Sequence, residues 1–135
     1  MAKPDQEPFS CVSIHHGSSY GFSKNRVSAR ETRPPVLEPR AAALYVNEED
    51  RQFFPEAFHQ AFGDDFFLIN TEQAIQKQIF GQGECLPGLE RYLGDFLALA
   101  VSDAALYQKT QHCRLIGIHA GLTPAEMLVP MIAVG

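Results

Sequence analysis

An apolar run in the second half of the chain, Asp95 to Val101, places the strongest limit on the fold. It reads Asp-Phe-Leu-Ala-Leu-Ala-Val and lacks the polar alternation of a strand that has one face in water. The run is therefore predicted to be a strand inside a sheet whose two faces are both covered. After Ser102-Asp103, residues 105–107 are predicted to return beside it as a hairpin.

Shorter apolar patterns predict further strands at four places, which are residues 9–14, 42–46, 66–69 and 129–134. The last of these is predicted to be a buried strand. The first stops at His15-His16-Gly17, where small residues break regular structure.

Two segments have the spacing of helices. Asn47 is predicted to cap the first, which carries phenylalanines at helical spacing, is split by Pro55 and ends at Gly63. The second starts after Asn70 and has a buried face up to Gly81, formed by Ala74, Ile75 and Ile79. Residues 42–80 are thus expected to form a small strand-helix-strand-helix insert in an α/β protein.

Residues 22–40 show no periodicity and end in Pro34-Pro35 and Pro39, so they are predicted to form a long loop. Their charge is mainly basic, and two interpretations stay open. The loop is a solvated surface segment, or it binds an anion such as phosphate. The second interpretation assigns weak phosphate binding to Arg26, Arg30 and Arg33.

Composition narrows the class of protein. A chain of 135 residues, with 45% hydrophobic and 20% charged residues, is one domain of an ordinary globular protein. A net charge of −5 argues against binding to duplex nucleic acid. The odd number of cysteines and the lack of a CxxC pair argue against a disulfide framework or a cysteine zinc site. With no signal peptide and no long apolar run, a cytoplasmic protein without a membrane segment is expected.

The most informative motif is the segment 117–130, Gly-Ile-His-Ala-Gly-Leu-Thr-Pro-Ala-Glu-Met-Leu-Val-Pro. Thr123 is predicted to cap a helix that has Pro124 in its first turn, and Glu126 completes a capping box. The helix must be short because Pro130 follows. His119 then lies in a turn fixed by a rigid helix start, which suits a metal ligand, although a lone loop histidine is more often structural or solvated.

The segment from His119 to Pro130 resembles a signature near the C-terminus of nucleotide pyrophosphatases, type I phosphodiesterases and PglZ-like members of the alkaline phosphatase superfamily. Two other segments are similar to that family in the same order. Residues 13–17, Ser-Ile-His-His-Gly, match a strand that ends in an Asp-His-Gly motif, and residues 93–100 match a strand that precedes the final histidine. The fold implied is the C-terminal part of an alkaline-phosphatase-like sheet, a single partial domain with core strands and a metal-ligand loop over about 93–135.

The resemblance also implies chemistry. In the family, two divalent ions, usually zinc, activate a Thr or Ser nucleophile for phosphoester hydrolysis. His119 matches a ligand of one ion, and His16 matches the histidine that binds the other. His15 stands where the family has an aspartate, which removes a negative charge from that site. Ala120 replaces a glycine.

The family's nucleophile and remaining ligands precede the Asp-His-Gly strand, where this sequence has only residues 1–8. The first hypothesis is therefore a fragment or degenerate relative of a phosphodiesterase, inactive alone and with no metal necessarily bound. The alternative is a non-catalytic module that self-associates or pairs with an N-terminal partner chain. His59 and His112 are interpreted as structural or exposed.

Overall fold

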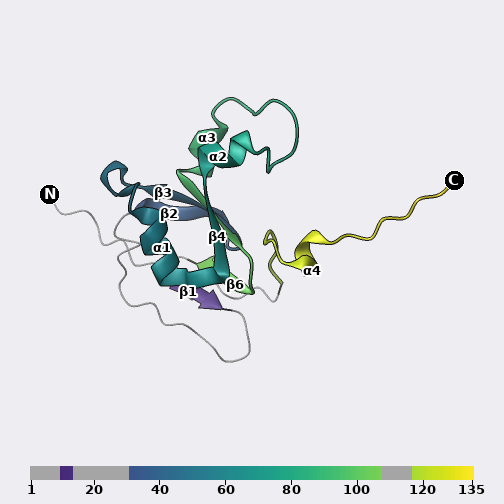
Figure 1. Ribbon diagram of the computed structural model, residues 1–135, viewed down its shortest axis with the longest axis horizontal. Helices are drawn as coiled ribbons and strands as arrows, with labels where there is room; N and C mark the ends of the chain where they lie inside the picture. Colours follow the sequence, from purple (N-terminus) through teal and green to yellow (C-terminus); the bar gives the residue numbers. More distant parts are fainter. Residues whose placement is uncertain (1–9, 14–30, 108–116) are drawn as a thin grey trace.

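The computed structural model describes residues 10–13, 31–107 and 117–135, and it is a mixed α/β protein built on an open antiparallel sheet. The sheet has four strands in the order β2-β3-β5-β4 (Figure 1). They are β2 (Glu31–Glu38), β3 (Ala41–Val46), β5 (Phe96–Ala100) and β4 (Phe66–Asn70). A separate antiparallel pair joins β1 (Ser10–Ser13) to β6 (Ala104–Tyr107).

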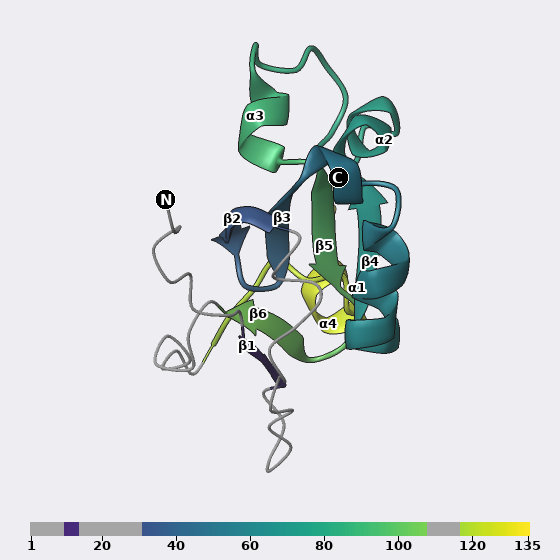
Figure 2. The ribbon, with the colours of Figure 1, turned by 90° about the vertical axis from the view of Figure 1, so that its left-hand side faces the viewer.

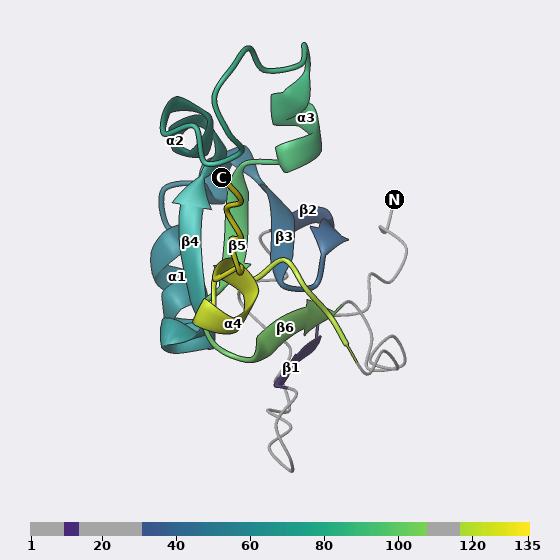
Figure 3. The same ribbon diagram turned by 90° about the vertical axis from the view of Figure 1, so that its right-hand side faces the viewer.

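The helices are short. Among the described residues they comprise two 3-10 turns, η2 (Glu48–Asp50) and η3 (Gly63–Asp65), and four α-helices, α1 (Phe54–Phe62), α2 (Thr71–Gln76), α3 (Leu89–Leu93) and α4 (Pro124–Met127). Figures 2 and 3 show α1 along one side of the sheet and α4 on the other, while α2 and α3 lie together at one end.

The predicted interior strand is confirmed as β5. It pairs with β3 on one side and with β4 on the other. Leu97, Ala98 and Ala100 are at most 1% exposed. Both faces of β5 are covered, because one hydrophobic cluster includes Phe96 and Ala98 and a second includes Leu97. A continuous apolar sequence is the pattern that such a strand requires.

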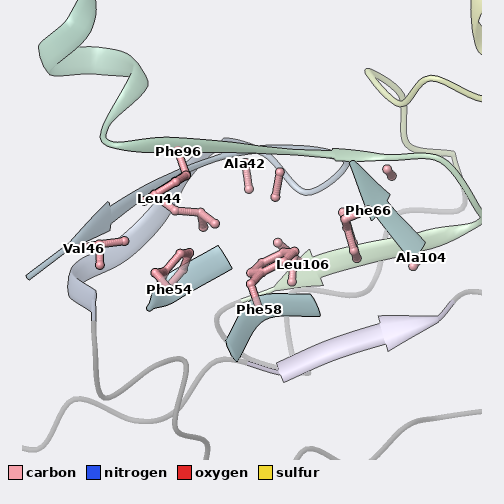
Figure 4. Packing of buried hydrophobic residues seen from close by; sticks show 11 residues of the cluster. Ala42, Leu44, Val46, Phe54, Phe58, Phe66, Phe96, Ala104 and Leu106 are labelled. Carbon is pink, nitrogen blue, oxygen red and sulfur yellow. The ribbon is translucent and has the colours of Figure 1, made fainter. Parts of the chain in front are cut away.

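Helix α1 covers the first face with phenylalanines (Figure 4). Phe54 and Phe58 are 0% and 2% exposed, and the Phe54 ring stacks on Phe96 with 5.3 Å between ring centroids. The predicted split near Pro55 is confirmed, because the segment forms two pieces, η2 and α1, and Pro55 occupies the first turn of α1, where no backbone N–H is needed. Asn47 precedes η2, but its side chain makes no capping hydrogen bond. Gly63 ends the helix as predicted.

Helices α2 and α3 cover the second face. The Asn70 side chain accepts hydrogen bonds from the backbone N–H groups of Glu72 (2.9 Å) and Gln73 (3.4 Å), so it caps the helix, which starts after Asn70 as predicted. Ala74 is fully buried. The helix stops at Gln76 rather than near Gly81, and Ile79 is 43% exposed, so the predicted buried face is too long.

Two predictions of strand organisation are wrong. Residues 31–38 of the predicted loop form β2, which tolerates Pro34-Pro35 because it is an edge strand with register shifts between Glu31 and Val36. Residues 104–107 do form a strand, but it pairs with β1 instead of returning against β5 as a hairpin. The strands of the predicted insert, β3 and β4, flank β5 within one sheet.

The predicted last strand is also wrong. Residues 129–134 form no strand, and Val129, Ile132 and Val134 are 79%, 89% and 94% exposed. The segment extends away from the body of the protein (Figure 1), and the described residues provide no strand that pairs with it. Among the described residues, no helix is long and apolar enough to cross a membrane.

Candidate functional site

The turn that carries His119 is built as its sequence predicts. The capping box between Thr123 and Glu126 is present, Pro124 occupies the first turn of α4, and the helix ends at Met127. His119 itself is exposed. The next residue, Ala120, has a φ of 81°, a backbone conformation that favours glycine. The turn is therefore sharply bent directly after the imidazole.

A backbone hydrogen bond fixes this turn to the sheet. The N–H of Leu122 donates to the carbonyl of Ala100, the last residue of β5, over 2.7 Å. Ala100 in turn donates its own N–H to the carbonyl of Arg40 over 2.9 Å. The His119 turn consequently lies at the carboxyl end of the central strand, beside the connection between β2 and β3.

The turn is further held by an ion pair between residues 86 positions apart. Arg40 donates from Nε to Oε1 of Glu126 (2.6 Å) and from Nη2 to Oε2 (2.7 Å). The remaining guanidinium contacts are to backbone carbonyls, from Nη2 to Ser102 (2.7 Å) and from Nη1 to Ala104 (2.8 Å). Two-pronged pairing of this kind fixes both groups in position and orientation.

The carboxylate of Glu126 is fully occupied within the turn. Besides Arg40, it accepts hydrogen bonds from the backbone N–H groups of Gly121 (3.0 Å) and Thr123 (3.3 Å) and from the Thr123 hydroxyl (2.6 Å). The Arg40 hydrogen bond, opposed by desolvation and aided by Thr123 and Gly121, lowers the pKa of Glu126 to about 2. A carboxylate with these partners is a structural anion rather than a proton acceptor or metal ligand.

Gly121 is required at its position by the same arrangement. A Cβ there would meet Oε2 of Glu126 and would lie 2.5 Å from Nη2 of Arg40. The glycine therefore lets the backbone approach the ion pair closely. The close approach explains why a glycine stands two residues before Thr123, a position that the capping box itself leaves open.

The role of Arg40 was not among the predictions from the sequence. The signal was present, because this arginine stands directly before a fully apolar strand, where a charged side chain has to find a partner. Its side chain is only 6% exposed. The identity of the partner could not be read from local periodicity.

The other predicted site residues are placed as follows. Ser13, which precedes the histidine pair His15-His16 in the sequence, ends β1 opposite Ala104. His15, His16, Arg26, Arg30 and His112 lie outside the described residues. His59 is exposed on α1, in agreement with its interpretation.

Arg33 does not join His119. Its guanidinium lies 3.4 Å from the centre of the Tyr45 ring, a cation–π contact. Tyr45 is near the far end of β3, about 17 Å along the strand from Arg40 at a rise of about 3.4 Å per residue. The predicted weak phosphate-binding role of Arg33 therefore has no link to the His119 turn.

The described residues contain no group of three or more His, Cys, Asp or Glu side chains that could hold a metal ion. His119 offers one imidazole, whereas zinc sites have three or four protein ligands. The described part of the chain thus provides a single candidate ligand on a rigid support and does not complete a metal site. No protein-family model, curated protein or solved structure matches this chain.

Proposed function

We propose that this chain supplies the late metal-binding histidine of a metal-dependent phosphodiesterase of the alkaline phosphatase superfamily, and that it is inactive by itself. The observation that carries the proposal is the exposed His119 on a turn fixed both to α4 and to the end of β5. A metal ligand needs such support, because its side chain must be held close to one geometry.

The position of β1 adds support. Ser13 pairs with Ala104. The Ala104 carbonyl accepts a hydrogen bond from Arg40, which also holds the His119 turn through Glu126. The sequence reaches His15 and His16 directly after this strand. In the proposal, His119 and His16 are ligands of a site that binds zinc or another divalent ion when complete. The nucleophile and remaining ligands come from another segment, and the substrate of the complete enzyme is a phosphoester.

Zinc binding tests the proposal. Competition with a chromophoric chelator would compare the chain with His119→Ala and with His59→Ala, a matched exposed histidine on α1. Because this chain supplies only part of the ligand set, zinc should bind it weakly. We expect His119→Ala to abolish this weak binding and His59→Ala to leave it unchanged. Equal affinity in all three proteins would reject the role of His119.

Hydrolysis of bis(4-nitrophenyl) phosphate tests the second part of the proposal. The isolated chain should release nitrophenol no faster than His119→Ala. Zinc-dependent turnover by the isolated chain would contradict the requirement for a nucleophile from elsewhere.

A second candidate function, a self-associating interaction module, is favoured by the C-terminal apolar segment. Six large apolar side chains in residues 127–134 are between 58% and 94% exposed. A continuous surface of this kind on a protein usually marks an interface. Strand β4 lies at the edge of the sheet and has no further strand partner among the described residues, and its Phe67 is half exposed, so this edge can pair with another chain.

Size-exclusion chromatography with light scattering measures the molar mass in solution and so tests for self-association. The chain should associate with rising concentration, and Ile132→Asp should return it to a monomer. Leu86→Asp is the control, because Leu86 is 77% exposed in a different part of the surface. A wild-type protein that stays monomeric at all concentrations would exclude the module.

A further inference from the structure

The two edges of the four-stranded sheet differ in their protection. One edge strand, β2, carries Glu31, Arg33 and Glu38 and is interrupted by Pro34-Pro35, and such residues hinder the addition of a further strand. The other edge strand, β4, reads Phe-Phe-Leu-Ile-Asn and has neither a charged residue nor a proline. Within the described chain, β4 pairs with β5 alone. The β4 edge is therefore the one at which another strand can pair.

The backbone of β4 presents hydrogen-bonding groups at this edge. The Asp65 carbonyl accepts from the N–H of Val101 over 3.0 Å, so the backbone of Asp65 faces the side of β5. Residues along an antiparallel strand direct their backbone groups alternately toward and away from a given partner. The N–H and C=O groups of Phe66 and Leu68 consequently face the open edge.

Apolar surface flanks this edge on both faces of the sheet. A groove of about 470 Å³ lies between α1 and β4 (Figure 3), and its lining includes Phe58, Phe66 and Leu68. Phe67 alternates onto the other face, which it shares with Ile69 of the second cluster, and it is 50% exposed. A strand added here would have apolar side chains against both of its faces, so it should be apolar at successive positions.

Residues 128–134 have that composition. They read Leu-Val-Pro-Met-Ile-Ala-Val and contain no polar or charged side chain. Leu128 already has extended backbone angles, with φ −83° and ψ 122°. The segment leads away from the body of the protein (Figure 1), so it would have to reverse direction to reach β4 of its own chain. A second copy can meet it without such a change.

The area of this contact suits a stable dimer. Residues 127–134 hold six large apolar side chains that are between 58% and 94% exposed. Burying side chains of this size removes on the order of 100 Å² each from water, and the surface that receives them loses a similar area. Two copies that exchange their segments would bury on the order of 2,000 Å² in total, which reaches the ~1,200–2,000 Å² of stable interfaces.

We propose that residues 128–134 of one copy add to the open edge of β4 in a second copy as a further strand. The inference rests on the self-association function proposed above, and it names the two surfaces that meet. Pro130 fixes the hydrogen-bonding pattern, because its nitrogen carries no hydrogen and this residue must face away from the sheet that it joins. The N–H groups of Met131 and Ala133 then bond to β4, while that of Ile132 faces solvent.

Amide hydrogen exchange in the wild type tests this pattern. At a concentration where the chain is associated, exchange should be slow at Met131 and Ala133 and fast at Ile132. Dilution to the monomer should make all three fast. Equally fast exchange at the three positions in the associated protein would overturn the inference, and this measurement needs no variant to fold.

A mixing experiment tests which surfaces meet. Phe67→Lys places a charge on the β4 edge and Ile132→Asp places one in the segment, so each variant alone should be monomeric. Mixed in equal amounts they should form a heterodimer, because the first keeps an intact segment and the second an intact edge. Val36→Lys is the matched control, since it adds the same charge to β2, where Val36 is 38% exposed, and it should associate like the wild type.

Size-exclusion chromatography with light scattering measures these masses, after circular dichroism has shown that each variant is folded. If the wild type associates but folded Phe67→Lys does so equally, or if the mixture stays monomeric, the inference fails and self-association stands. A wild type that is monomeric at all concentrations removes both. Slow exchange at Met131 in such a monomer would place the segment on its own chain, which also excludes the second copy.

Discussion

Acid should weaken the protein through Glu126 in a definite pH range. Its ordinary pKa of 4.5 falls to about 2 in the folded state, first because of Arg40. The unfolded chain therefore binds a proton more readily than the folded one. The stability contributed by this group is complete above about pH 4.5 and is lost as the pH falls toward 2.

The size of the effect follows from the same two values. A pKa difference between 4.5 and about 2 corresponds to about 3 kcal/mol. The Glu126 side chain is 18% exposed, and solvent screening reduces this to about 2 kcal/mol. Replacement of Glu126 by glutamine should remove the whole pH-dependent contribution, because glutamine does not titrate in this range.

Urea unfolding at pH 6 and at pH 2.5, followed by circular dichroism, measures the contribution. The free energy of unfolding of Glu126→Gln should lie at least about 2 kcal/mol below that of the wild type at pH 6 and approach it at pH 2.5. Glu72→Gln is the control, because the exposed carboxylate of Glu72 accepts a hydrogen bond from Gln76 within α2, over 3.4 Å, and is not part of the Arg40 ion pair. A gap between wild type and Glu126→Gln that is equal at both pH values would refute the reasoning.

Four further substitutions test the packing around the site and the core, each by urea unfolding. Gly121→Ala should cost about 2–3 kcal/mol, because the new Cβ displaces the ion pair and its charge-assisted hydrogen bonds, and an unchanged midpoint would contradict that crowding. Ala120→Gly should stabilise by about 1 kcal/mol, because it relieves a positive φ, and destabilisation would show that the turn is not strained. Phe54→Ala should cost about 3–5 kcal/mol and Phe53→Ala less than 1, since Phe54 is 0% and Phe53 is 55% exposed; equal losses would contradict the assigned core.

Local chemistry in the sequence was a reliable guide. The apolar run of β5, the phenylalanines of α1, the Asn70 cap and the Thr123 capping box all appear where residue type and spacing predict them. The two caps are made by contacts within one short segment. The burial of β5 and of the α1 phenylalanines is so complete that the composition of each segment already shows it. The short helix before Pro130 follows from the same kind of signal.

Pairing between distant segments could not be predicted in this way. Residues 104–107 have the composition of a strand, but nothing local says that their partner is β1 rather than β5. Prolines argued against β2, although an edge strand accepts them. The ion pair between Arg40 and Glu126 depends on β5, whose last residue, Ala100, is hydrogen-bonded to both Arg40 and Leu122.

The C-terminal segment differs for another reason. Residues 129–134 have the composition of a buried strand, yet burial needs a covering surface, and the described residues do not form one over Val129 or Val134. Composition alone reports what a segment favours, not whether a partner is present. The self-association experiment therefore shows whether a second copy of the chain covers residues 129–134, under either proposed function.

Titration of the isotopically labelled chain with Zn²⁺, followed through the imidazole resonances of His119 and His16, tests most directly whether these two side chains share a metal site. Both rings should shift together with one saturation midpoint, and the ring of His59 should not move. Shifts confined to one of the two rings, or separate midpoints for them, would contradict a common site.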